Sequence, residues 1–432
     1  MNRNKSVFVV LLVLSLAVAF LPEFRVVKAE PQTIVVPDDY FTIQEAIDAA
    51  SEGDTVFVKS GIYSEDLVIG KSLSLVGEDK ETTTVTGDGN VALVVQQDNV
   101  NVTGFTFKRP STMRWYYGIH LISVRHCNVF GNILRSTFYG IWLFDSSFNS
   151  IYENNCTGNY HGIFLSDSDF NDVSENHMTG SSASGIGVTG SSNNTITGNY
   201  VASSGWCGID ISGEDPSCGN LIMGNIVTEN GDYGISISSA GSTENRIVSN
   251  NITLNGNPDA GDVALLIAWD NNLVERNRIT GNQAGIRIDG SRDNTIRWNL
   301  IENNPEGGIL IHSYPGREAL NNIIYENNII NNPVALSGLQ ENIQANKWDL
   351  KSRGNYYSSY TGTDNNGDGI GDTQYVLGKD NVDAYPLMEQ VNIQTIPEFP
   401  SWTLLPLLLS ATLVAVTYRK RLHSKSSFIL GA

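Results

Sequence analysis

Short runs of alternating apolar and polar residues recur along the chain, and most of them open with Gly-Ile. The runs return mostly every 22 or 23 residues, with longer steps where extra residues are inserted. Alternation of period two is typical of β-strands and not of helices. The runs begin at Gly118, Gly140, Gly162, Gly185, Gly208, Gly234, Ala264, Gly285 and Gly308.

A column of asparagines accompanies these runs, at Asn132, Asn154, Asn176, Asn199, Asn225, Asn250, Asn277, Asn299 and Asn327. Each strand is too short to bury a face alone, so successive units must stack. One circuit of strands and turns in about 22 residues predicts one coil of a parallel β-helix, with coils about 4.8 Å apart. In that architecture stacked asparagines bond the coils above and below. The glycine before isoleucine suits a tight corner, where a side chain would collide or φ must be positive.

A solenoid needs a cap at its open end. The stretch TIQEAIDAA predicts a short helix, because Thr42 and Glu45 have the spacing of a capping box and Ile43, Ala46, Ile47 and Ala50 share one helical face. We therefore expect an N-terminal cap over residues 30–54 and β-helix coils over residues 55–350.

Both ends of the chain have special composition. Residues 1–29 run from basic to apolar to small, the order of a secretory signal peptide. Residues 401–418 carry no charge and are followed by a basic tail at 419–432 that begins Arg419-Lys420-Arg421, which predicts a transmembrane helix with a cytoplasmic tail. We expect an exported protein on the extracellular face of the membrane, joined to its anchor by a linker at 390–400.

The charge of the exported part limits its partners. Residues 30–418 contain 19 Lys and Arg against 45 Asp and Glu, a net charge of −26. Such a field repels nucleic acid, so DNA and RNA binding are not expected. The four cysteines permit disulfides outside the cell, and a pair between Cys207 and Cys218 would close an inserted loop, whereas Cys127 and Cys156 suggest no pairing.

Three stretches resemble one known family. TIQEAIDAASEGDTVFVKSGIY, the Asn and Gly-Ile repeats, and GNYYSSYTGTDNNGDGIGD followed by AYPLM are similar to the NosD-like proteins, of the carbohydrate-binding and sugar-hydrolase (CASH) group. The resemblance spans roughly residues 33–389 and implies an all-β, right-handed parallel β-helix. The stretch from Pro397 to Ser401 resembles archaeal PEF-type sorting signals, which implies processing by a sortase-like enzyme.

The resemblance also implies two activities that the residues do not support. NosD proteins are accessory factors in copper-centre assembly, but the six His and five Met are scattered, without the clustering that copper prefers. Enzymes with this fold carry signatures such as Asp-Pro-His-Asp in alginate epimerases, or Asn-Thr-Asp with Gly-His-Gly in polygalacturonases. Neither signature occurs in the sequence.

The stretch TDNNGDGIGD has the ligand spacing of a short calcium loop. Asp364, Asn366 and Asp368 alternate before a glycine, Ile370 offers a carbonyl, and Asp372 completes the set. We expect a structural Ca²⁺ within a C-terminal segment at 351–389. The alternative is an Asp- and Gly-rich turn that holds no metal.

The outward positions of the Gly-Ile strands are where a ligand would lie. The row contains His120, Trp142, Phe164, Gly187, Asp210, Ser236, Arg287 and Leu310. Trp142 and Phe164 fall on adjacent coils near Trp115 and Tyr116, and exposed rings in a row suit the apolar faces of sugars. The alternative is that the loop around Trp115 folds over them as a small secondary core.

Two groups of residues are candidates for catalysis. Asp145 and Asp167 are equivalent on adjacent coils, near the separation of the two carboxylates in a retaining glycosidase, yet both lie in turns where Asp commonly caps amides. Asp289 and His312 are in register beside Arg287, which makes either an acid–base pair or a surface ion pair.

The sequence therefore predicts a cell-surface β-helix protein that binds a polysaccharide or an envelope glycan. Three alternatives stay open: a polysaccharide hydrolase or lyase, a structural surface protein or adhesin, and a NosD-like copper-assembly accessory.

Overall fold

The computed structural model describes residues 30–87, 89–108, 116–257, 261–314, 316–333, 335–336, 346–378 and 381–393. Contacts divide the chain into residues 1–32, of which 30–32 are described, and residues 33–432, which hold every element named below. The expected signal peptide, membrane helix and basic tail lie outside the described residues. Within the described ranges, no helix combines the length and the apolar character that a membrane crossing requires.

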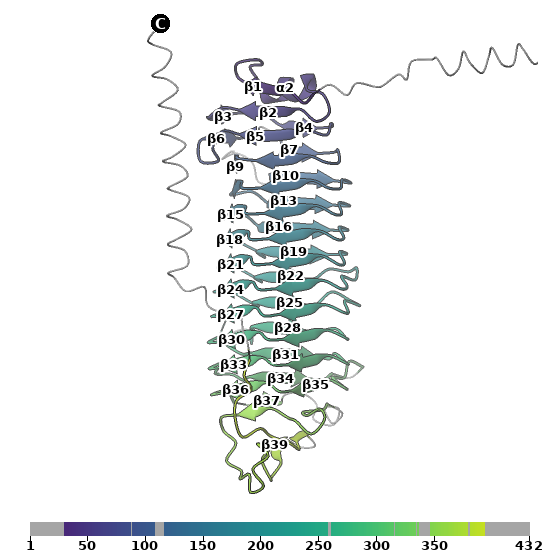
Figure 1. Cartoon of the computed structure of the whole chain (residues 1–432), viewed down its shortest axis with the longest axis vertical. Coiled ribbons are helices and arrows are strands. Elements are labelled where there is room, and N and C mark those ends of the chain that lie inside the picture. The colour runs from purple at the N-terminus through teal and green to yellow at the C-terminus, as the bar shows by residue number, and fades with distance from the viewer. Residues whose placement is uncertain are drawn as a thin grey trace, which may run out of the picture. The chain divides into compact units, whose positions relative to one another are not determined.

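Three parallel sheets wind into a β-solenoid of about 12 turns, as predicted, with one short helix at its start (Figure 1). Each coil passes through sheet C, then sheet A, then sheet B, as in β10, β11 and β12. Every strand pairs with its equivalent one coil away, so neighbours in a sheet are about one repeat apart in sequence.

Sheet A consists of β1 (Thr33–Val36), β2 (Thr55–Val58), β5 (Ser74–Gly77), β8 (Asn101–Thr103), β11 (Asn128–Phe130), β14 (Ser150–Tyr152), β17 (Asp172–Ser174), β20 (Thr195–Thr197), β23 (Leu221–Met223), β26 (Arg246–Val248), β29 (Leu273–Glu275), β32 (Thr295–Arg297) and β35 (Ile323–Tyr325).

Sheet B consists of β3 (Gly61–Tyr63), β6 (Thr83–Val85), β9 (Thr106–Lys108), β12 (Ile133–Arg135), β15 (Asn155–Thr157), β18 (His177–Thr179), β21 (Tyr200–Ala202), β24 (Ile226–Thr228), β27 (Asn251–Thr253), β30 (Arg278–Thr280), β33 (Leu300–Glu302), β36 (Asn328–Ile330) and β38 (Tyr356–Tyr357).

Sheet C consists of β4 (Leu67–Ile69), β7 (Val91–Val95), β10 (Tyr117–Ile122), β13 (Tyr139–Phe144), β16 (His161–Ser166), β19 (Ile186–Thr189), β22 (Ile209–Ile211), β25 (Ile235–Ile237), β28 (Leu265–Ile267), β31 (Ile286–Asp289), β34 (Ile309–His312) and β37 (Ala335–Leu336). A separate antiparallel pair joins β39 (Tyr375–Gly378) to β40 (Asn381–Asp383).

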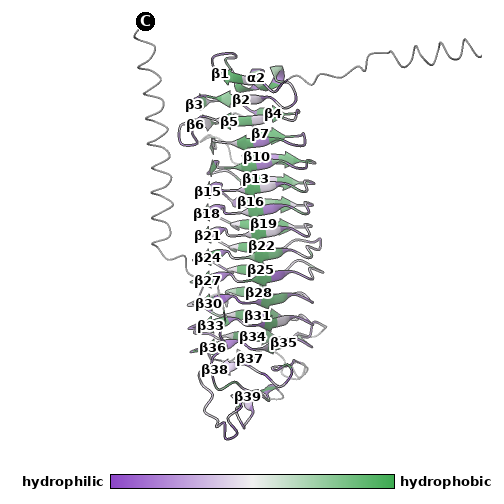
Figure 2. Cartoon of the chain, viewed as in Figure 1, coloured by the Kyte–Doolittle hydropathy of each residue, from purple (hydrophilic) through white to green (hydrophobic). Residues whose placement is uncertain are grey.

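The core is a stack of aliphatic side chains inside the coils. Ile119, Ile141 and Ile163 are fully buried on sheet C, and Val129 and Ile151 on sheet A. Figure 2 shows hydrophobic and polar residues side by side along the strands. Each strand therefore buries one face within its own coil, which is why a pattern of period two recurs at every repeat.

The glycine of each Gly-Ile run lies close to the next coil. A Cβ built on Gly140 would be 2.4 Å from the carbonyl oxygen of Gly162, and one on Gly118 would be 2.4 Å from that of Gly140. Neither residue has a positive φ, so of the two predicted reasons for glycine, collision is the operative one.

Three buried columns of asparagine bond the coils together. The predicted column runs through the corner between sheets A and B, where the amide of each Asn donates to the Oδ1 of the next, as from Asn225 to Asn250 at 3.0 Å. Two further columns include Asn149 with Asn171, between sheets C and A, and Asn255 with Asn282, between sheets B and C. From β11 onward, most corners are thus bonded to the corresponding corner of the next coil.

The two ends extend beyond the predicted boundaries. β1 pairs with β2 although it lies inside the expected cap, and β38 pairs with β36 although it follows residue 350. The predicted helix is confirmed as α2 (Ile43–Ala49), whose N-cap Thr42 accepts from the Glu45 amide at 3.2 Å. Its buried residues Ile43 and Ala46 face the first coils.

Candidate functional site

The outward row of sheet C has the register that the repeats predict. His120 pairs with Trp142, Trp142 with Phe164, and Phe164 with Gly187 on successive strands. Asp210 follows Gly187 on the next strand. The row is therefore a continuous column of outward positions across β10, β13, β16, β19 and β22, with a gap at Gly187, which has no side chain.

Six rings form one cluster over β10, β13 and β16, which we call the aromatic patch. Its members are Tyr117, His120, Tyr139, Trp142, His161 and Phe164, and all are half-buried. The ring centroids of His120 and Trp142 are 4.0 Å apart, and the two ring planes are nearly parallel. Those of Tyr139 and Phe164 are 4.9 Å apart and also stacked, while Tyr139 and Trp142 are 5.1 Å apart. Two stacks in contact thus cover three coils.

Three ring nitrogens in the aromatic patch are buried and have no hydrogen-bond partner: His120 Nε2, Trp142 Nε1 and His161 Nδ1. Burial lowers the pKa of both imidazoles to about 4, so both are neutral at pH 7. A buried polar atom without a partner is costly, and most such atoms in folded proteins are paired. The patch therefore offers polar groups that a ligand could satisfy, beside rings that a ligand could contact.

Asp210 lies next to the aromatic patch along the same column. A Cβ on Gly187 would be 2.5 Å from the Phe164 ring, so that ring leans over the gap between Phe164 and Asp210. The Ser212 hydroxyl donates to Asp210 Oδ2 at 2.7 Å, and burial raises the pKa of the Asp210 carboxyl. A carboxyl with a raised pKa beside an aromatic surface is a feature of many functional sites.

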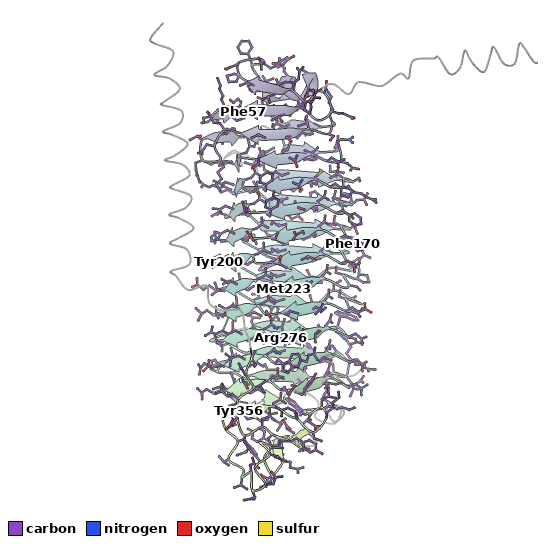
Figure 3. All side chains as sticks on the ribbon, in the orientation of Figure 1. Phe57, Phe170, Tyr200, Met223, Arg276 and Tyr356 are labelled. Atoms are coloured by element: carbon purple, nitrogen blue, oxygen red, sulfur yellow. The ribbon has the colours of Figure 1, made fainter. Side chains whose placement is uncertain are left out.

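The other predicted sugar-binding residues have different fates. Trp115 lies outside the described residues. Tyr116 is fully buried, and its hydroxyl accepts from the Gly87 amide at 2.7 Å, so the expectation of an exposed ring was wrong for this residue. Its side chain belongs to the core because the chain enters β10 at this point. Phe170, exposed and stacked on Phe148 at 5.0 Å, projects at the right-hand edge of Figure 3, outside the aromatic patch.

Tyr117, Tyr139 and His161 were not predicted. All three directly precede the glycine of a Gly-Ile run, and Tyr139 and His161 pair in register. An aromatic or imidazole ring at the same position of three consecutive repeats is the signal that would have identified them.

Asp145 and Asp167 occupy exposed corners where φ is +49° and +51°. Asp145 Oδ2 accepts from the Ser123 hydroxyl at 2.8 Å, and Asp167 Oδ2 from the Ser166 hydroxyl at 3.2 Å. Asp145 thus bonds to the equivalent corner of the preceding coil and Asp167 to a hydroxyl of its own corner, contacts that agree with a structural role in the turns.

The second predicted group is assembled as expected, since Asp289 pairs in register with His312 and lies 3.9 Å from the Arg287 guanidinium. Arg287 also donates to Tyr233 Oη and to the Gly261 carbonyl, both at 2.8 Å. Burial lowers the pKa of His312, with Arg287 adding to the effect. Arg287 therefore uses two donors on Tyr233 and Gly261, whereas its Nε and Asp289 Oδ1 are buried without a hydrogen-bond partner among the described residues.

The carboxylates of the predicted calcium loop accept hydrogen bonds from the loop itself. Asp364 accepts from the amides of Gly367 and Gly369 at 2.7 and 2.8 Å, and Asp372 Oδ2 accepts from the Asn365 amide at 2.8 Å. Ile370 donates its amide to Asp368 Oδ1. Binding of Ca²⁺ by Asp364, Asn366, Asp368, Ile370 and Asp372 stays a prediction.

Among the residues that the structure describes, the His and Cys side chains that a copper site would use are not grouped. All four cysteines are free, which corrects the expected Cys207–Cys218 disulfide: Cys207 is buried, and the Cys218 thiol donates to the Gly241 carbonyl at 3.4 Å. Across the described part of the chain, no three His, Cys, Asp or Glu residues are grouped as metal ligands. In the aromatic patch, Tyr139 and Trp142 lie beside the two imidazoles, which face different neighbours. These residues do not fit a copper centre.

Solved structures similar to this chain are β-helix proteins. They include DFA-IIIase from Arthrobacter chlorophenolicus A6 without its lid (TM-score 0.55, 15% identity, 71% of this chain and 98% of that one). The catalytic domain of a GH87 α-1,3-glucanase matches with a TM-score of 0.51 (13% identity, 74% and 70%), and the Dettilon tailspike protein with 0.50 (17%, 73% and 70%). Identities this low establish the fold alone.

A cell surface glycoprotein of Methanothermus fervidus is 29% identical over 335 residues, which are 77% of this chain. The match spans only 53% of the glycoprotein, about half of its length. The profile of one protein family matches residues 47–230 and 215–362, which together exceed half of the chain. The chain therefore belongs to the family described as periplasmic copper-binding protein (NosD).

Proposed function

We propose that this chain is an exported cell-surface β-helix protein that binds carbohydrate at the aromatic patch. The observation that carries the proposal is the combination, on three adjacent coils, of six rings with three unpartnered ring nitrogens. The apolar faces of sugar rings pack on aromatic side chains, and sugar hydroxyls can pair with neutral imidazole and indole nitrogens.

Two comparisons support the extracellular part of the proposal. The family description is periplasmic and the glycoprotein relative is named for the cell surface. Our proposal includes the sequence-based expectation that a C-terminal helix anchors the protein until a sortase-like enzyme processes it. The glycan is either an envelope glycan or an external polysaccharide.

The test is binding of the purified protein to a polysaccharide array, followed by titration calorimetry with the ligand that binds best. We expect Trp142→Ala to weaken binding at least tenfold and Trp142→Phe, which keeps a ring but removes the indole N–H, to weaken it less. Phe170→Ala is the matched control, because this ring is exposed and stacked but outside the patch. Equal binding by Trp142→Ala and the native protein, with the fold intact, would favour the structural or adhesin alternative.

Hydrolysis of the bound glycan is a second candidate function, favoured by Asp210. Burial raises the pKa of this carboxyl, the direction that favours a general acid, and the residue adjoins the patch. Release of reducing sugar from the ligand that binds, lost in Asp210→Asn but not in Asp145→Asn, would establish this activity. Binding without any release of sugar would exclude it for that ligand.

A further inference from the structure

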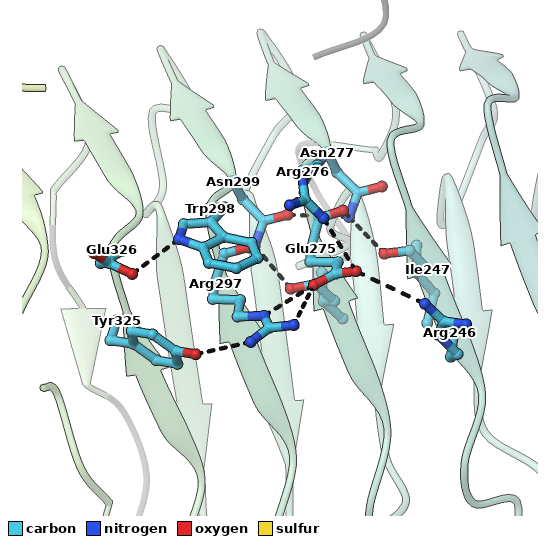
Figure 4. A network of polar contacts seen from close by, with 11 residues as sticks. Arg246, Ile247, Glu275, Arg276, Asn277, Arg297, Trp298, Asn299, Tyr325 and Glu326 are labelled. Atoms are coloured by element: carbon cyan, nitrogen blue, oxygen red, sulfur yellow. Dashed lines mark hydrogen bonds and ion pairs between the residues drawn. The ribbon is translucent and has the colours of Figure 1, made fainter. Parts of the chain in front are cut away.

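One buried carboxylate on sheet A is surrounded by three arginines from successive coils (Figure 4). The Glu275 side chain on β29 is only 5% exposed. Arg297 on β32 lies 2.7 Å from it, Arg276 in the following turn 3.4 Å, and Arg246 on β26 3.8 Å. Three positive charges therefore meet one negative charge.

Arg297 makes the shortest contacts with the buried carboxylate, all to Oε2, whereas Arg246 and Arg276 face Oε1. Its Nε and one terminal nitrogen contact Glu275 Oε2, and the other terminal nitrogen donates to Tyr325 Oη at 3.0 Å. Arg246 and Arg276 each make one longer contact, and their side chains are 55% and 41% exposed. Two guanidinium groups thus keep most of their donors toward solvent, while the carboxylate holds them in place.

A tryptophan orders the same surface. The guanidinium carbons of Arg276 and Arg297 lie 4.5 and 4.2 Å from the centroid of the Trp298 ring. The indole N–H donates to Glu326 at 2.9 Å, and Glu326 also accepts from Arg353. Cation–π contact and these bonds reduce the freedom that the arginines would lose on binding a ligand.

The positive surface contrasts with the rest of the exported chain. Residues 30–245 contain 8 Lys and Arg against 26 Asp and Glu, whereas residues 246–353 contain 10 against 12. An ordinary solvated surface of this protein would share its acidic character. The local excess of arginine is therefore a feature of these coils and needs its own explanation.

We propose that Arg246, Arg276, Arg297 and Trp298, the arginine patch, bind the carboxylate or sulfate groups of an acidic polysaccharide. Guanidinium groups pair with such anions through two parallel hydrogen bonds. The arginines come from three successive coils, Arg246 and Arg297 from strands of sheet A and Arg276 from the turn after β29, an arrangement suited to a polymer that carries repeated negative charges. The strong negative charge of the remaining chain repels any polyanion, and it repels duplex DNA, with one charge per about 1.7 Å of helix axis, more than a polysaccharide that carries one charge per sugar. The patch lies on a different sheet from the aromatic patch, and it does not depend on sugar binding there.

The test uses the full chain with polygalacturonate, with neutral dextran of similar length, and with duplex DNA, each at 20 and 200 mM NaCl. We expect polygalacturonate to bind and to weaken at least tenfold at the higher salt, and dextran not to bind at the arginine patch. Arg246→Gln combined with Arg276→Gln should weaken polygalacturonate binding at least tenfold. Arg135→Gln is the matched control, since this arginine is 47% exposed and lies on earlier coils.

Three results would overturn the proposal: tighter binding of DNA than of polygalacturonate, an equal loss in Arg135→Gln, or an unchanged affinity in the double variant. Arg246→Gln alone, which alters the most exposed of the three side chains, provides the same test if the double variant unfolds. Polygalacturonate binding should persist in Trp142→Ala, which separates this inference from the function proposed for the aromatic patch.

Discussion

Removal of the Asn225 side chain from its buried asparagine column should destabilise the solenoid far more than removal of the half-buried Asn251 side chain. The side chain of Asn225 accepts from the backbone amide and the side chain of Asn199, at 2.9 and 3.0 Å. It also donates to the Ile196 carbonyl and to Asn250 Oδ1. Asn225→Ala deletes these bonds at a position with 0% exposure.

The magnitude follows from the groups that lose their partners. The Asn199 amide loses its bond to Asn225, and one unpaired buried donor costs about 1–3 kcal/mol, while each further lost bond costs about 1 kcal/mol. We therefore expect Asn225→Ala to lower the free energy of unfolding by about 4–6 kcal/mol. Asn251→Ala removes only an acceptor for Arg278 at 3.3 Å on a half-buried side chain, so we expect it to cost less than about 1 kcal/mol.

The assay is urea unfolding followed by circular dichroism, with hydrogen exchange of the Asn199 amide as a local readout. Repeat proteins can unfold in parts, so the local measurement guards against a transition that is not two-state. Equal midpoints for Asn225→Ala and Asn251→Ala, with unchanged protection of the Asn199 amide, would refute the idea that the asparagine columns hold the coils together.

Three other predictions concern a buried acid, the corner glycines and the loop at 364–372. Burial raises the pKa of Asp383 from 3.8 to about 6, so the folded state favours the protonated carboxyl. The free energy of unfolding should therefore be highest below pH 4 and fall by about 3 kcal/mol as the pH rises through 6. Asp383→Asn should flatten this slope in unfolding midpoints measured from pH 4 to 8. Gly140→Ala should lower the melting temperature by several degrees, because its Cβ would be 2.4 Å from the Gly162 carbonyl oxygen. Gly70→Ala should be tolerated, because a Cβ there has no atom within 4 Å. Equal melting temperatures of the two variants would contradict this account. If the loop binds Ca²⁺, calcium should raise the melting temperature of the native protein but not that of Asp364→Asn. An unchanged melting temperature in both proteins would favour the alternative of a turn that holds no metal.

The fold could be predicted because its determinants repeat. The period of the Gly-Ile runs sets the length of a coil, and the register of the sheet C row followed directly from it. One asparagine column was evident from sequence, but the other two are displaced by five residues and were hidden among many polar turn residues. Nothing local distinguishes a turn asparagine that bonds to its own loop from one that bonds to the next coil.

The candidate site was predicted only in part, because exposure depends on what lies above a residue. The alternation of apolar and polar residues correctly placed Trp142 and Phe164 on the outward face. Tyr116 is also an aromatic residue close to the row, but it is buried. The arginine patch was missed because Arg246, Arg276 and Arg297 come from three different repeats and meet only through Glu275. Raised or lowered pKa values likewise arise from burial, which the sequence pattern does not encode.

The last position of the asparagine column has a consequence for self-association. Asp383 Oδ2 accepts from the Asn355 amide at 2.7 Å, in the place that the next asparagine would otherwise fill. An ionised carboxylate accepts but cannot donate, so it offers no N–H to a further coil. An open end of stacked strands is a template on which another molecule can add strands. A single oxygen in place of a nitrogen thus ends this column of asparagine bonds at Asp383 and reduces the bonding that an added coil would gain there.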